Sequence, residues 1–64
     1  MSDQNAFLTD RLREEGFGVK ILDGIIVAYL HNRALGCGEV VDAVPELEGF
    51  PMKRVKDSVF ISVR

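Results

Sequence analysis

His31 and Cys37 are the only histidine and the only cysteine of the 64-residue chain, and both side chains are capable of nucleophilic or acid–base chemistry. A Cys–His pair is catalytic only when the two groups are in hydrogen-bond contact and a third group orients the imidazole. Asn32 and Asp42 are the candidates for that third group. We expect no catalysis here, because so short a chain has little material for a pocket, and a solvated histidine with a small buried cysteine is the simpler interpretation.

Other site-forming patterns are weak. The segment Gly36-Cys37-Gly38 lacks both the Lys-Ser/Thr pair of a phosphate-binding P-loop and the third glycine of a dinucleotide fingerprint. One cysteine excludes an internal disulfide and a cysteine-based zinc site, and the carboxylates do not follow calcium-loop spacing. We therefore expect no catalytic residue, no metal site and no cofactor.

The stretch around which the chain is organised is a predicted β-hairpin over residues 17–30. Two runs rich in β-branched residues flank Asp23-Gly24. A two-residue hairpin turn needs a left-handed backbone, which glycine adopts freely and aspartate tolerates. A helix over residues 3–15 precedes this hairpin, with Gly16 at its expected C-terminal cap.

After the first hairpin, a second helix is predicted over residues 33–47. Glycines interrupt its start, so its regular part is expected to begin near residue 38. Residues 51–64 form a second predicted hairpin with a turn around Lys56, Asp57 and Ser58. Its last strand is expected at a sheet edge, where unpaired backbone groups invite a partner strand.

An internal repeat suggests how these elements combine. Glu15-Gly16-Phe17 matches Glu48-Gly49-Phe50, and residues 23–27 align with residues 57–61 if the second copy has one extra residue. The match is short, so chance is the alternative. The chain length and the predicted elements favour a single α+β domain over residues 1–64, whether or not the repeat is real. We expect an (αββ)₂ arrangement, a four-stranded antiparallel sheet with two helices on one face.

The first hairpin is apolar on both faces, and two helices cover only one. If Leu22 lies opposite Ile25, one face carries Lys20, Leu22, Ile25, Val27 and Tyr29. The other face is wholly apolar and, taken alone, resembles a core. The repeat alignment nevertheless places the first face inward, leaving an exposed patch that we expect to bind a partner or a second copy in a homodimer. The patch consists of Val19, Ile21, Ile26, Ala28 and Leu30.

Charge is unevenly distributed along the chain. Residues 34–50 carry only acidic side chains, and residues 51–64 carry an excess of basic ones. The simplest interpretation is that the two segments neutralise each other across a helix–sheet contact. Alternatively, the acidic set binds a basic partner surface, or the basic set follows a phosphate backbone. The acidic set is Glu39, Asp42, Glu46 and Glu48, and the basic set is Lys53, Arg54, Lys56 and Arg64.

Composition bounds the function. A net charge of −2 and a pI near 5.2 count against nucleic-acid binding, which usually needs a basic excess. No apolar run is long enough to span a membrane, and the polar N-terminus does not resemble a signal peptide, so a cytoplasmic protein is expected. We expect a non-enzymatic protein–protein interaction module, a small accessory or inhibitor protein. The analogy is with phage or mobile-element inhibitors such as anti-CRISPR proteins, and a small nucleic-acid-binding regulator is the alternative.

Overall fold

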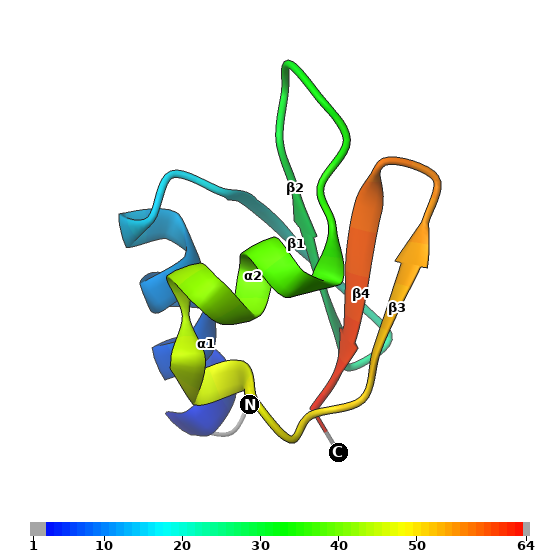
Figure 1. Ribbon diagram of the computed structural model, residues 1–64. Helices are drawn as coiled ribbons and strands as arrows, with labels where there is room; N and C mark the ends of the chain where they lie inside the picture. Colours follow the sequence, from blue (N-terminus) through cyan, green and yellow to red (C-terminus); the bar gives the residue numbers. More distant parts are fainter. Residues whose placement is uncertain (1–2, 64) are drawn as a thin grey trace.

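Two tight turns, Asp23-Gly24 and Lys56-Asp57, each reverse the chain between paired antiparallel strands. The computed structural model describes residues 3–63 and places these two hairpins in one sheet beside the helices (Figure 1). The elements in chain order are α1 (Asp3–Glu14), β1 (Gly18–Leu22), β2 (Ile25–Tyr29), α2 (Cys37–Ala43), the 3₁₀ helix η1 (Pro45–Leu47), β3 (Met52–Val55) and β4 (Ser58–Ser62).

A glycine in the left-handed region, where a residue with a Cβ is disfavoured, follows α1 and also follows η1. Gly16 has φ 94° and Gly49 has φ 96°. The second helix is shorter than the predicted residues 33–47, because Pro45 cannot continue the hydrogen-bond ladder of α2 and instead opens η1. The backbone before Cys37 is a loop, and Gly36 is the N-cap.

The strand order is β1-β2-β4-β3, and all neighbours are antiparallel. The prediction that the C-terminal strand lies at an edge is therefore wrong, because β4 pairs with β2 as well as with β3. The edges are β1 and β3, which carry Lys20, Lys53 and Arg54. Charged side chains on edge strands discourage pairing with a further strand.

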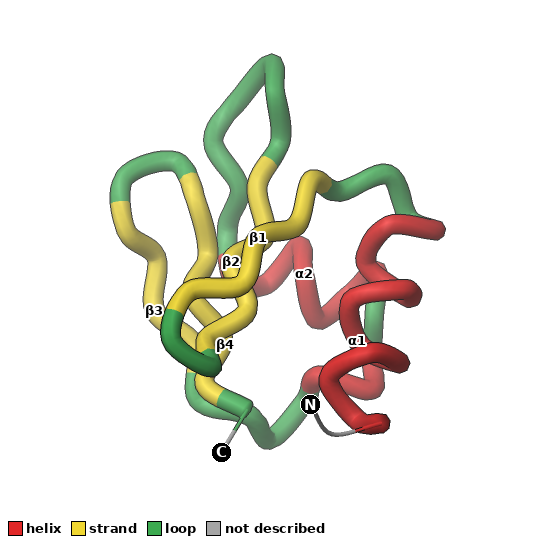
Figure 2. Tube along the Cα trace, turned by 180° about the vertical axis from the view of Figure 1, so that it is seen from behind, coloured by secondary structure: helices red, strands yellow, loops and turns green. Residues whose placement is uncertain are grey.

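Both helices cover the same face of the sheet, so the predicted α+β class with two helices on one face is confirmed (Figure 2). One buried hydrophobic cluster joins the helical segments to the sheet. Leu8 and Leu12 belong to α1, and Ile26, Ala28, Val59 and Ile61 belong to the sheet. The other members come from the loop before α2 and from the segment of α2 and η1, and they are Leu35, Val40, Val44 and Leu47. Within residues 3–63, no helix is long and apolar enough to cross a membrane.

The face of the first hairpin that contains Ile26 is the core, so the prediction of an exposed patch is wrong for four of its five residues. Ile26 and Ala28 are fully buried, and Val19 and Leu30 pack against the cluster, whereas Ile21 is 42% exposed. The error comes from the one-residue insertion in the repeat alignment. An alignment without the insertion would instead place Asp23 (φ 52°) opposite Lys56 (φ 57°), and both are left-handed turn residues. A shift of one residue moves every side chain of a strand to the opposite face.

Candidate interaction surface

The sheet face turned away from the helices has no layer over it in the described chain. We call it the outer face, and the strand register assigns its members, since cross-strand partners share a face. They are Gly18, Lys20, Leu22, Ile25, Val27, Tyr29, Lys53, Val55, Ser58, Phe60 and Ser62. The sequence correctly indicated that one face of the first hairpin is left uncovered, but it assigned the wrong face.

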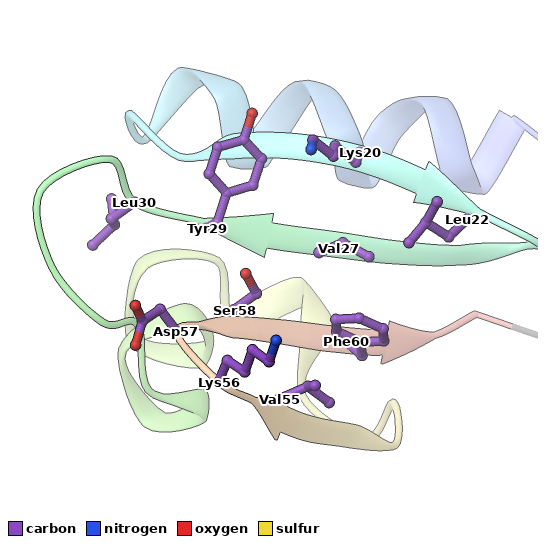
Figure 3. A pocket seen from close by; sticks show the side chains of 10 residues that line it. All are labelled: Lys20, Leu22, Val27, Tyr29, Leu30, Val55, Lys56, Asp57, Ser58 and Phe60. Carbon is purple, nitrogen blue, oxygen red and sulfur yellow. The ribbon is translucent and has the colours of Figure 1, made fainter.

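A groove of about 460 Å³ crosses this face (Figure 3). It follows the paired strands from Leu22 and Val27, and its other end lies beyond Ala28 and Val59, where the pairing of β2 with β4 stops. Beyond that point the chain after β2 turns back, and the Leu35 N–H donates to the Asp57 carbonyl at 3.0 Å. The lining residues are Lys20, Leu22, Val27, Tyr29, Leu30, Val55, Lys56, Asp57, Ser58 and Phe60.

The centre of the groove is apolar. Val27 is 5% exposed at its floor, and the half-buried rings of Tyr29 and Phe60 stand beside it. Leu22 is 51% exposed, which is unusually open for a leucine in a sheet. The centre of the outer face is therefore apolar and largely buried, and the aliphatic side chain of Leu22 beside it remains exposed to water.

Basic side chains border the groove from two sides. Lys20 comes from β1, and its Nζ lies 5.7 Å from the centroid of the Tyr29 ring. Lys56 comes from the β3–β4 turn and extends along the opposite side of the groove (Figure 3). Lys53 lies across from Phe60 on β3, on the same face. Sequence reasoning missed Lys20, because its proximity to the second hairpin arises only when β2 pairs with β4.

The predicted basic set does not form one stripe. Lys53 pairs with Phe60 and Arg54 with Val59, so these two neighbours point to opposite faces of the sheet. Lys56 lies in the turn, and Arg64 lies outside the described residues. Arg54 therefore does not share the outer face with Lys53, whereas Lys20, which was not part of the predicted basic set, does.

The predicted acidic set lies on the helical side, and its four members are exposed. Two of them are in ion pairs: Glu39 contacts Arg33 at 2.6 Å, and Glu46 contacts Arg11 at 2.8 Å. Hydrogen bonds from these guanidinium groups lower the pKa of both carboxyls. The sequence predicted that the basic C-terminal hairpin neutralises the acidic segment. For Glu39 and Glu46 that interpretation is wrong, because their partners are Arg33 and Arg11. Asp42 and Glu48 are exposed on the same side of the molecule.

His31 and Cys37 belong to different surroundings. His31 is exposed and meets Tyr29 edge-on, with ring centroids 5.3 Å apart and planes at 86°. Cys37 is half-buried against the core. Among the described side chains, no three His, Cys, Asp or Glu residues are close enough together to hold a metal ion.

The outer face and its groove are thus the surface whose function needs an explanation. No protein-family model, curated protein or solved structure matches the chain, so the functional argument rests on the geometry of this face.

Proposed function

We propose that the protein is a non-enzymatic protein–protein interaction module that binds its partner through the outer face of the sheet. The observation that carries the proposal is the uncovered apolar side of a sheet whose other side holds the whole core. In an antiparallel sheet the face turned to solvent usually carries polar side chains, whereas this face carries Leu22, Val27, Tyr29, Val55 and Phe60. Exposed apolar surface rimmed by polar residues is a feature of interaction sites.

The arrangement of polar and apolar groups favours a protein as the partner. Protein interfaces have a desolvated apolar centre, enriched in aromatic residues, and a charged rim. On the outer face, Tyr29 and Phe60 lie beside Val27 at the centre, and Lys20 and Lys56 lie at the margin. By analogy with small phage-encoded inhibitors, the module would act by occupying a surface that its partner needs.

A homodimer is a less favourable arrangement on this face. The face that contains Ile26, through which a homodimer was expected, is the core. A symmetric dimer with the two grooves directly opposite each other would bring the positive charges of Lys20 and Lys56 in one copy close to those in the other. Like charges across an interface oppose association, so the partner is proposed to be a different protein.

The test compares two surface substitutions on opposite sides of the molecule. Leu22 on the outer face and Phe7 on α1 are both 51% exposed, so replacing either with Asp disturbs the fold to a similar, small extent. Wild type, Leu22→Asp and Phe7→Asp are immobilised in parallel and exposed to nuclease-treated lysate of the source cells. Retained proteins are then quantified by mass spectrometry.

A protein retained by wild type and by Phe7→Asp, but lost with Leu22→Asp, supports the proposal. If retention is the same for all three baits, or is lost only with Phe7→Asp, the outer face is not the working surface. Light scattering of the same proteins detects self-association, and a dimer that Leu22→Asp dissociates would replace the proposed partner with a second copy.

One observation favours a second candidate, a small nucleic-acid-binding regulator. The outer face carries Lys20, Lys53 and Lys56 together with the rings of Tyr29 and Phe60. Single strands bind surfaces that combine cations for the backbone with rings for the bases. A shift of labelled oligothymidylate that weakens steeply with salt would support this candidate, and no shift at low salt would remove it.

A further inference from the structure

Building on the proposed function, we infer that the partner presents an acidic segment to the groove. In this arrangement an apolar side chain of the segment enters between Tyr29 and Phe60, and flanking carboxylates pair with the amines of Lys20 and Lys56. Three features of the groove support this inference. They are the charge of its lining, the two lysine amines that form no internal ion pair, and the backbone conformation of Lys56.

The first feature is the charge of the lining. Lys20 and Lys56 border an apolar floor from opposite sides, and Asp57 lies at the end of the groove beside Leu30 (Figure 3). Electrostatic complementarity across an interface places negative charge opposite such a pair. A segment with carboxylates on both sides of an apolar residue matches this pattern.

The second feature is that neither amine forms an ion pair with a residue in the described part of the chain. The arginines on the helical side behave differently, since Arg11 pairs with Glu46 and Arg33 pairs with Glu39. Lys20 and Lys56 are exposed, and Lys20 has the Tyr29 ring as its neighbour. Both amines can therefore meet an incoming carboxylate without breaking an internal ion pair.

The third feature is the backbone at Lys56. Its φ of 57° lies in the left-handed region, where glycine or asparagine is the favoured residue of a tight turn. A lysine with this conformation is strained, and strained residues cluster at functional sites. This turn places the basic side chain of Lys56 at the margin of the groove.

A nucleic acid fits these features less well than an acidic peptide. Leu22, Leu30 and Val55 offer aliphatic surface, which suits an apolar side chain better than a stacked base. The net charge of −2 also repels a polyanion more strongly than a segment with a few carboxylates.

The experiment selects peptides from a phage-displayed random library on the immobilised full chain and measures their binding by fluorescence polarisation. Lys20→Glu and Lys56→Glu are compared with Arg54→Glu, which makes the same charge change on β3 but on the opposite face from Lys53. Urea unfolding confirms that each variant is folded. Leu22→Asp serves as the test of the face itself, and labelled oligothymidylate is the competing probe.

We expect selected peptides with Asp or Glu on both sides of a Leu, Ile or Phe. Binding should weaken about tenfold in Lys20→Glu and in Lys56→Glu, remain unchanged in Arg54→Glu, and lose this difference as salt screens the pairs. If Leu22→Asp abolishes binding but the two lysine variants do not weaken it, the outer face is the interface and the acidic partner is wrong. If no selected peptide depends on Leu22, both proposals fail. Oligothymidylate binding that Lys56→Glu and Arg54→Glu weaken alike would overturn the inference in favour of the nucleic-acid candidate.

Discussion

The ring of Tyr29 occupies the space in which a side chain of Gly18 would stand. The two residues are cross-strand partners in β1 and β2, and a Cβ built on Gly18 would collide with the Tyr29 ring. An aromatic ring placed over a glycine on a neighbouring strand is a known way of stabilising a sheet edge. Gly18 therefore allows Tyr29 to lie over β1, where the ring forms one wall of the groove.

Gly18→Ala should destabilise the fold and change the groove. The new methyl group must displace the Tyr29 ring, and overpacking of this kind costs about 1–3 kcal/mol. Urea unfolding measures the loss, and Gly38→Ala is the control, because an added Cβ there meets nothing within 4 Å in α2. The control should gain up to about 1 kcal/mol from better helix propensity. Equal stability of Gly18→Ala and wild type would show that the ring does not rest over Gly18.

Ile26→Ala and Leu22→Ala should differ sharply, although both residues belong to the first hairpin. Ile26 is 0% exposed, so its truncation leaves a cavity and costs about 2–5 kcal/mol. Leu22 is 51% exposed, and its truncation should change the free energy of unfolding by less than about 0.5 kcal/mol. Chemical denaturation of the two variants checks the assignment of faces. The reverse ranking would mean that the outer face, not the helical face, is the core.

The contact between Arg11 and Glu46 should make stability depend on pH. The hydrogen bond from Arg11 lowers the pKa of Glu46 in the folded protein, so the folded state favours the charged carboxylate. The resulting stabilisation is fully present above the ordinary pKa of a glutamate. It is lost as the pH falls from about 4.5 through the lower folded-state value.

Thermal unfolding from neutral to acidic pH tests this linkage. Arg11→Gln should lower the Tm at neutral pH and flatten the decrease of Tm toward acidic pH, because the variant no longer stabilises ionised Glu46. Arg13→Gln is the matched control on α1, since its contact with Asp10 is 3.8 Å and the residue is exposed. A pH profile of Arg11→Gln that parallels wild type would exclude this pair as a source of the acid sensitivity.

Lys56→Gly should stabilise the protein while weakening partner binding. Glycine relieves the strain of the left-handed backbone at this turn, but it also raises the conformational entropy of the unfolded chain, which offsets part of the gain. The net increase in the free energy of unfolding is about 0.5–1 kcal/mol. Lys53→Gly, in the interior of β3, should instead lose about 0.5–1 kcal/mol. Unfolding midpoints and peptide affinities of the two variants are measured together. A Lys56→Gly variant that is less stable than wild type would show that the turn is not strained.

Several features of the fold could be read from local residue patterns. The first hairpin turn follows from Asp23-Gly24, and the end of the first helix follows from Gly16, because these positions need a backbone that glycine adopts readily. The apolar spacing of residues 3–15 predicted α1 almost to its observed end at Glu14. Local chemistry decides such features, so a single sequence suffices to predict them.

The sequence by itself therefore determined the αββ order of the elements, the α+β class and the fact that one sheet face is left uncovered. Only the tertiary structure decided which face that is, since both faces of the first hairpin are apolar and a one-residue shift in alignment exchanges them. The pairing of β2 with β4 is equally non-local: it makes the C-terminal strand central and brings Lys20 to the same groove as Lys56. Strand order and face depend on which distant segments bury their apolar side chains together, and no local pattern contains that information.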